Sequence, residues 1–396
     1  MFTVKIAKDA PMKRIKWENR PFLLAVFLFM LCTSGYGARA SSPLIRVKIL
    51  QDKSRVEVGA TGSYSIGALD LAKGRSFPSS HSGVTIEASQ QGIRASGEIW
   101  GGEVLIKPEG GNSLIRVDSR RYRGQIIVQQ KGSLLEVINE LPLEEYLWGV
   151  IKAEISPNWP RACVLAFTIA ARTYAFKKLQ GPSSRTTGYH VSSEQEDQVY
   201  RGVEGEDSLS LERVNQTRGK ILTYLGEIIE AKYHACCGGY TTSLRDVWGG
   251  EGYPYLVAKP DDFCSKSPYF SWEFKIEAEK LREILKNKGL VLGRVYRIKL
   301  LEFDQSRRVK RVEIQHQEGK TELTGTKLRE LVGEGNLRST LFTVKRFAAD
   351  FFFKGKGWGH GVGLCQEGAK VMGEQGYTYK EIMEFYYPGT TVENVY

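Results

Sequence analysis

The chain has 396 residues, of which 41% are hydrophobic and 26% are charged, and its formal net charge is +11. This composition is typical of a globular protein with two domains, or with one domain and a large insertion, and it excludes a disordered or repetitive chain. No basic run with interleaved aromatic side chains occurs, so we expect no nucleic-acid partner.

The first 40 residues have the pattern of a secretory signal peptide. Six Lys and Arg residues within 5–20 precede a short apolar stretch at 22–31, and Ala38-Arg39-Ala40 fits a small-x-small cleavage site. This predicts an extracytoplasmic protein. The alternative is an uncleaved anchor, in which case the protein would also contact the membrane. Residues 41–396 keep 49 basic and 43 acidic side chains, an excess that suits an anionic polymer but also fits plain solubility.

Residues 41–140 form a β-rich N-terminal region. Short β-branched runs are separated by Gly, Ser, Asp or Asn turns. The last two runs, 124–130 and 134–139, predict a hairpin around 131–133. Chemistry-bearing residues are sparse here, so we interpret the region as a scaffold or a polymer-docking module. The expected strands are 45–50, 84–88, 103–108, 124–130 and 134–139.

A helix is predicted to begin at Pro142 and to end before Pro157. Its positions Leu143, Leu147 and Val150 share one face with Glu154, so the carboxyl points toward the interior or into a cleft at its edge. Burial raises the pKa of a carboxyl, which is how a general acid is kept protonated near neutral pH. The alternative is that Glu154 lies at the edge of the face and pairs with a surface Lys or Arg.

A second helix is predicted from Pro160 to Leu179. It is almost entirely apolar over 162–171 and is followed directly by Arg172. A buried Arg needs a partner because an unpaired charge is costly in the interior. Glu154 or an anionic ligand could supply the negative charge, and a structural salt bridge is the alternative.

The middle of the chain offers polar and aromatic candidates for a cleft. Gln198 and Tyr200 lie in a polar stretch and could face a sugar. A hairpin is predicted over 221–235, and Gly238-Gly239 after it permits close backbone approach beside His234.

Five cysteines remain after the leader. Cys163 lies in an apolar run and is interpreted as a buried thiol. Cys236 or Cys237 with Cys264 is the disulfide candidate, since an exported protein permits one. A zinc site that uses His234 lacks the usual CxxC spacing, so no metal is expected.

Residues 265–345 predict an inserted α+β module with many surface charges. Its expected elements are a helix at 276–289, strands at 295–303, 309–317 and 321–325, and a helix at 326–333.

The C-terminal part, 346–396, begins with a glycine-rich loop. Glycines at 355, 357, 359 and 361 alternate with other residues, let the backbone pack tightly, and present His360. A helix is expected over 363–372. The glycines are not a dinucleotide fingerprint because no βαβ unit with a ribose-binding acid follows.

Several motifs together resemble the SpoIID/LytB family, which comprises stage II sporulation protein D and the amidase enhancers. They occur in the family's order across roughly 120–390. The matching segments are INELPLEEYLWGVIKAEI (138–155), AARTYA (170–175), QVYRG (198–202), YHACCGGYTT (233–242), GKGWGHGVGLCQEGA (355–369) and YYPGT (386–390).

The resemblance implies a cell-wall lytic transglycosylase that acts on glycan strands and needs no cofactor. It places the catalytic glutamate at Glu154 and gives Arg172 a role in substrate binding. Some family members bind zinc through Cys and His between AARTYA and QVYRG. Here that segment has His190 and no cysteine, so no zinc is expected there, and the Cys237–Cys264 pair is a structural guess. The predicted substrate-binding residues are Arg172, Gln198, Tyr200, Tyr233, His234, His360 and Gln366.

The implied reaction needs one carboxyl, whereas a conventional hydrolase would use a second, spaced carboxylate. Glu144 and Glu145 are explained as charges at the start of a helix. A non-catalytic wall-binding protein that enhances a partner amidase is the alternative function.

The predicted fold class is α+β, with a mainly helical catalytic core and surrounding β-hairpins. Residues 141–264 and 346–396 form this core, 41–140 the β-rich part and 265–345 the insertion.

Overall fold

The structure, a computed structural model, describes residues 41–68, 74–80, 83–182 and 186–396. The predicted signal peptide, 1–40, lies outside these residues. Within them, no helix has both the length and the apolar composition that crossing a membrane requires. Mixed helices and strands, with strands alone before residue 143, confirm the predicted α+β class.

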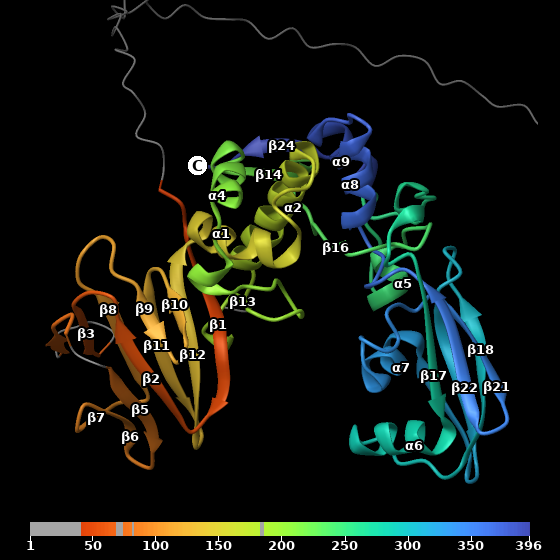
Figure 1. Cartoon of the computed structure of the whole chain (residues 1–396), viewed down its shortest axis with the longest axis horizontal. Coiled ribbons are helices and arrows are strands. Elements are labelled where there is room, and N and C mark those ends of the chain that lie inside the picture. Colours follow the sequence, from red (N-terminus) through yellow and green to blue (C-terminus); the bar gives the residue numbers. More distant parts are fainter. Residues whose placement is uncertain (1–40, 69–73, 81–82, 183–185) are drawn as a thin grey trace, which may run out of the picture. The chain divides into compact units, whose positions relative to one another are not determined.

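The N-terminal region consists of two antiparallel sheets that share one hydrophobic core (Figure 1). The predicted hairpin is confirmed, with Gln125 paired to Glu140 and Lys131 to Leu134. Only β13 joins its neighbour β1 in parallel. The first sheet has the order β13 (Val191–Ser192), β1 (Leu44–Lys53), β12 (Leu134–Pro142), β11 (Gln125–Lys131), β8 (Glu103–Pro108), β3 (Tyr64–Gly67) and β4 (Gly74–Phe77). The second has the order β10 (Arg120–Tyr122), β9 (Ile115–Val117), β2 (Arg55–Ala60), β5 (Val84–Ser89), β6 (Gly92–Ala95) and β7 (Glu98–Trp100).

Helices follow directly from β12. Pro142 caps α1 (Leu143–Glu154), and α2 (Arg161–Gln180) begins after Pro160, as the prolines predict. Helix α2 contacts α1, α4 (Ser208–Gln216), α8 (Gln366–Glu374) and α9 (Tyr379–Tyr386), which explains why its sequence is apolar on most sides. Short 3-10 helices lie at Gly202–Gly205 (η1) and Phe263–Lys266 (η2), and α5 spans Leu244–Trp248.

The predicted hairpin over 221–235 is much shorter than expected. Strand β14 (Lys220–Tyr224) pairs with β15 (Glu227–Ile228) at two positions only, and β24 (Thr391–Asn394) occupies its other edge. The chain then turns away, and β16 (Tyr233–His234) pairs in parallel with β23 (Leu364–Cys365). The pairing of β16 with β23 takes the place of the expected hairpin pairing, and it joins the motifs at 233–242 and 355–369. Helix α8 likewise begins at Gln366, after β23, and not at Gly363.

The elements expected in the insertion are present, and they surround a hydrophobic core of their own. This core runs from Trp272 to Phe353, because β22 pairs with both β17 and β21. Its elements are β17 (Ser271–Glu277), α6 (Ala278–Asn287), β18 (Val295–Phe303), β19 (Val309–His316), β20 (Gly319–Thr324), α7 (Gly325–Val332), β21 (Phe342–Phe347) and β22 (Asp350–Lys356).

Candidate active site

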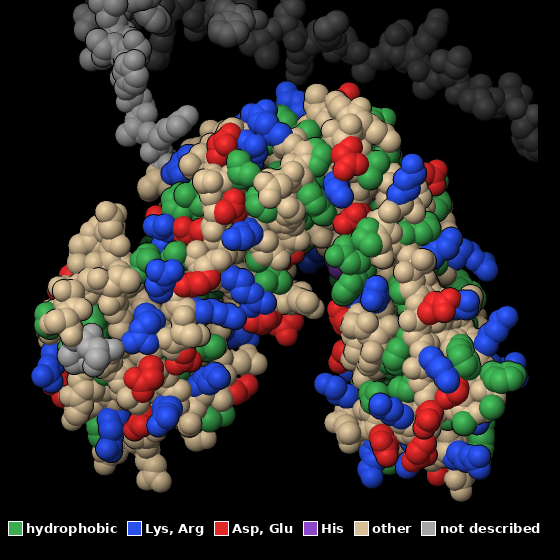
Figure 2. Space-filling view, in the orientation of Figure 1, with side chains coloured by type: hydrophobic (Ala, Val, Ile, Leu, Met, Phe, Trp, Pro, Cys, Tyr) green, Lys and Arg blue, Asp and Glu red, His purple; other side chains and the backbone are tan. Residues whose placement is uncertain are grey.

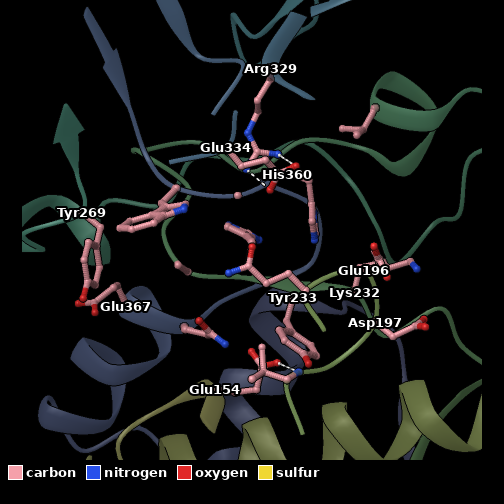
Figure 3. Close-up of a pocket in the computed structure, with 18 of the residues that line it drawn as sticks. Glu154, Glu196, Asp197, Lys232, Tyr233, Tyr269, Arg329, Glu334, His360 and Glu367 are labelled. Atoms are coloured by element: carbon pink, nitrogen blue, oxygen red, sulfur yellow. Dashed lines mark hydrogen bonds and ion pairs between the residues drawn. The ribbon is translucent and has the colours of Figure 1, made fainter. Parts of the chain in front are cut away.

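A cavity of about 1100 Å³ lies where the two cores meet (Figure 3). Its walls come from the end of α1, the loop before Val199, β16, α5, α7, the glycine-rich loop and the start of α8. This volume exceeds the usual range for a small-molecule site and suits a segment of a polymer. On the face seen in Figure 2, basic and acidic side chains are intermingled, in keeping with the small charge excess.

Glu154 is the last residue of α1 and reaches the cavity half-buried. Burial raises the pKa of its carboxyl to about 6, although the Val199 N–H and the Gln366 and Tyr233 side chains act in the opposite direction. The Val199 N–H donates to Oε1 at 2.7 Å. Arg201 lowers this pKa least among the named groups, and it pairs with Glu194. A surface salt bridge of Glu154 is therefore not seen among the residues described.

Arg172 lies away from the cavity, with its side chain fully buried. It forms a bidentate ion pair with Glu144, with Nε–Oε1 at 2.8 Å and Nη2–Oε2 at 2.9 Å. Its remaining N–H groups donate to the Val214 carbonyl and the Thr217 hydroxyl. Glu144 thus supplies the negative charge expected from Glu154 or a ligand, as in the alternative of a structural salt bridge, and Arg172 does not line the cavity. Glu144 therefore lies at the start of α1, as expected, and is also the buried partner of Arg172.

Gln198 and Tyr200 are also buried and do not line the cavity. Gln198 accepts from the Tyr146 hydroxyl at 3.1 Å and donates to the Ala171 carbonyl at 3.2 Å. Tyr200 donates to Asn139 Oδ1 at 2.9 Å. These side chains fix the backbone on both sides of Val199, whose N–H holds Glu154. In this structure the two side chains, predicted to contact sugar, make buried hydrogen bonds beside the segment that contacts Glu154.

The other predicted substrate-binding residues, Tyr233, His234, His360 and Gln366, line the cavity together with Glu154. Burial, with Arg308 nearby, lowers the pKa of His234 to about 3, and its Nδ1 lies 3.2 Å from the Val362 carbonyl. Burial also holds the pKa of His360 well below its usual value. Both imidazoles are therefore neutral near pH 7 and can offer polar contacts without charge.

Aromatic side chains form much of the cavity wall, and the sequence analysis gave them no role. Trp248, Tyr269 and Trp358 line it, and Trp248 is 53% exposed. Lys232 Nζ lies 5.6 Å from the Trp248 ring centroid and 4.8 Å from that of Tyr174. Flat exposed rings of this kind offer large apolar contact area with little conformational cost. Trp248 and Trp358 each lie beside glycines in the sequence, and this pattern could have pointed to them.

The glycine-rich loop packs directly on β16 and the following residues. Gly359 has φ +105°, and a Cβ there would lie 2.8 Å from the Cβ of His234. Trp358 forms a two-way backbone bridge with Cys236. The predicted tight packing is confirmed, and it sets the position of His360 beside His234.

Replacing Gly359 by Ala should lower the free energy of unfolding by about 1–3 kcal/mol from backbone strain, with a further loss from the clash. Gly376→Ala is the matched control, because Gly376 has φ +88° and no atom within 4 Å of its added Cβ. Urea unfolding of both variants separates the two contributions. Equal losses in the two variants would contradict tight packing at Gly359.

Two family models and several known proteins match this chain in sequence. The family model described as "Stage II sporulation protein" (SpoIID) matches residues 131–224, and a domain of unknown function, DUF8618, matches 262–363. Stage II sporulation protein D of Bacillus subtilis (strain 168) is 30% identical over 269 residues, which cover 64% of this chain and 75% of that protein.

The chain belongs to the SpoIID family.

Two further relatives show how the resemblance is distributed. The amidase enhancer of Bacillus subtilis (strain 168) is 30% identical to this SpoIID protein over 345 residues, 74% of this chain but only 47% of the enhancer. An uncharacterized protein of Brachyspira hyodysenteriae is 30% identical over 271 residues, 68% of this chain and 72% of that protein. The SpoIID match covers α1, α2 and the Val199 loop, the segments that position Glu154, whereas DUF8618 covers the insertion.

Proposed function

We propose that this SpoIID protein is an exported peptidoglycan lytic transglycosylase that uses Glu154 first as acid and then as base. The observation that carries the proposal is the half-buried Glu154 carboxyl, whose pKa is raised to about 6 and whose Oε1 accepts a backbone N–H at the edge of a polymer-sized cavity. The substrate would be the glycan strand of alternating N-acetylmuramic acid and N-acetylglucosamine, with its stem peptides removed.

In the first step, neutral Glu154 donates its proton to the glycosidic oxygen while the bond from muramoyl C1 to that oxygen breaks. In the second step, the muramoyl C6 hydroxyl oxygen bonds to C1, and its proton passes to the Glu154 carboxylate. The product ends in a 1,6-anhydro ring, no water is consumed, and Glu154 returns to its protonated state. Neutral His234 and His360 could contact hydroxyl or acetamido groups without competing for the proton.

Two other carboxylates in the cavity, those of Asp197 and Glu334, have ion-pair partners. Asp197 accepts from the Tyr174 hydroxyl and from Ser192 N–H, and it pairs with Lys178. Glu334 pairs with Arg329 on the opposite wall (Figure 3). Because both carboxylates are engaged by these contacts, they favour a one-carboxyl reaction over hydrolysis by two free carboxylates.

The direct test is digestion of purified peptide-free glycan by the full chain, with products analysed by mass spectrometry. A lytic transglycosylase releases fragments that are lighter than the hydrolysis products by the mass of one water. Hydrolytic products would contradict the mechanism, and intact glycan would contradict enzyme activity.

The activity should depend on pH through Glu154. Its carboxyl must be protonated to begin the reaction, so kcat/KM should be highest below about pH 6 and fall about tenfold per pH unit above it. The pKa of His234, about 3, places its titration far from this limb. A pH profile measured on soluble peptide-free glycan checks this, and a rate that is flat or rising from pH 6 to 8 would contradict it.

A second function is an enhancer that binds the wall and stimulates a cell-wall amidase. The similarity to the amidase enhancer over 345 residues favours it. It predicts glycan pull-down without cleavage, and faster release of stem peptides when an N-acetylmuramoyl-L-alanine amidase is added.

A further inference from the structure

Three segments far apart in sequence bring a group of sulfur atoms together behind the cavity wall. The Sγ atoms of Cys237, Cys264 and Cys365 and a carboxylate oxygen of Asp261 all lie within 4.8 Å of one another, and all four residues are buried. Cys237 Sγ lies 3.3 Å from Cys264 Sγ and 3.2 Å from Asp261 Oδ2. The predicted Cys237–Cys264 pair is thus adjacent, but both residues are free thiols.

Backbone donors surround these sulfur atoms. Gly239 N–H points to Cys237 Sγ at 3.4 Å, and Cys237 N–H points to Cys365 Sγ at 3.2 Å. Cys365 also caps α8, where Gly368 N–H reaches its sulfur at 3.4 Å. Hydrogen bonds to the charged form and a helix N-terminus both favour thiolate over thiol. These backbone groups therefore favour negative sulfur, whereas the Asp261 carboxyl at 3.2 Å from Cys237 Sγ opposes it unless a cation lies among these atoms.

A buried cation adds to this field. Arg308, from the insertion, is 2% exposed and donates to the carbonyls of Cys237 and Tyr240 at 2.7 and 3.0 Å. It forms no salt bridge with a carboxylate in the part of the chain that the structure describes. Its backbone N–H donates to Asp304 Oδ1 at 2.8 Å, so the Asp304 carboxylate and the sulfur atoms of the group both lie near this cation. A guanidinium buried this close to the cysteines favours ionised over neutral sulfur.

Asp261 is held in the orientation of a ligand. Its Oδ2 accepts from the Tyr386 hydroxyl at 2.9 Å, and its Oδ1 accepts from Phe263 N–H at 3.2 Å. Outer contacts of this kind are how proteins orient the carboxylate ligands of a metal. A disulfide between two of the cysteines would leave the third thiol and this buried carboxyl without a purpose.

We propose that Cys237, Cys264, Cys365 and Asp261 bind one zinc ion. Thiolates at about 2.3 Å from a tetrahedral zinc lie about 3.8 Å apart, so the 3.3 Å between Cys237 and Cys264 requires only a small outward movement. Three thiolates select zinc over magnesium or calcium. Four protein ligands make the site closed, hence structural and not catalytic. These four ligands have no CxxC spacing, which is why the sequence predicted no metal here.

The zinc would hold together the segments that form one wall of the cavity. It would join the 236–239 loop, the segment around η2 and Cys365, the residue before α8. Gln366 is the next residue after Cys365, and its side chain lines the cavity and contacts Glu154. The site does not depend on the proposed reaction, because its role is to hold segments in place. Metal content therefore tests it independently of glycan cleavage.

The experiment is metal analysis of the full chain purified under reducing conditions and exposed to Zn²⁺ and then dialysed. We expect about one zinc per chain, and substitution by Co²⁺ should give the thiolate-to-metal absorption of a tetrahedral site. Cys237→Ser, Cys365→Ser and Asp261→Asn should each weaken zinc binding by about tenfold or more. If a variant fails to fold, the Co²⁺ spectrum of the parent still tests the ligand set.

Cys163→Ser and Cys236→Ser are the controls. Cys163 is a buried thiol on α2 outside the group, and Cys236 adjoins the group without being one of the four ligands. Both variants should keep the zinc. Absence of zinc in the parent, a Cys237–Cys264 disulfide found by peptide mapping, or zinc retained by Cys237→Ser and Cys365→Ser would each overturn the proposal. Loss of zinc in Cys236→Ser would overturn Asp261 as the fourth ligand.

Discussion

Glu154→Gln should release no detectable anhydromuramoyl product from peptide-free glycan, with kcat lowered by about 10²–10⁴-fold or more. Glutamine keeps the size of the side chain and can still accept the Val199 N–H, but it can neither donate nor take up the proton. Both chemical steps use the same carboxyl, so the loss should lie toward the upper end of that range. Mass spectrometry of the digest measures it.

The variant should also be at least as stable as the parent at pH 7. The raised pKa of Glu154 means that the folded protein is most stable when this carboxyl is protonated, and stability falls as pH rises through about 6. Glutamine removes that cost, which is about 1–2 kcal/mol near neutral pH. The two proteins should unfold alike near pH 4. A variant less stable than the parent at pH 7 would contradict the inferred electrostatics of the site.

Glu367→Gln is the matched control for activity. Glu367 also lines the cavity, one residue after Gln366, and burial raises its pKa as well. The one-carboxyl reaction gives it no proton to transfer, so the variant should keep most of the cleavage rate. Loss of activity equal to that of Glu154→Gln would indicate a two-carboxyl hydrolase instead.

Arg172→Ala should lower the free energy of unfolding by about 3–5 kcal/mol. The substitution leaves the Glu144 carboxylate buried and unpaired, since the two side chains are 0% and 2% exposed. Urea unfolding measures the loss. The protein that remains folded should bind glycan with an unchanged KM, because Arg172 does not line the cavity.

Two further variants separate burial from charge. Arg172→Met combined with Glu144→Leu should recover most of the stability, since removing both members of a buried pair is often neutral. Arg121→Ala breaks an exposed pair with Glu204, 48% and 38% exposed, and should cost less than about 1 kcal/mol. An Arg172→Ala variant that is stable but binds glycan weakly would instead support the direct substrate contact implied by the family resemblance.

Local signals predicted the helices around Glu154 well. Prolines at 142, 157 and 160 and the apolar spacing define α1 and α2 closely, because these effects act within one or two turns. The β11–β12 hairpin follows from its turn in the same way. Glu154 could be placed on the apolar face from spacing alone, and its role came from the resemblance.

Long-range partners were beyond local patterns. Nothing near Arg172 marks Glu144, 28 positions away, as its partner, and nothing near β16 marks β23. Gln198 and Tyr200 have side chains that suit both sugars and buried hydrogen bonds, so only their burial decides between the two. The grouping of Cys237, Asp261, Cys264 and Cys365 likewise depends on three separate chain segments meeting.

The cavity has walls that belong to two independent hydrophobic cores. The acid and the Val199 N–H come from the first core, whereas Arg329 and Glu334 on the facing wall come from the insertion. Under the proposed function, the wall that supplies the acid and the wall that faces it can therefore vary separately. Under the same proposal, a chimera that carries a different insertion between residues 264 and 357 would be expected to cleave the same glycosidic bond and to change which glycan strands it binds.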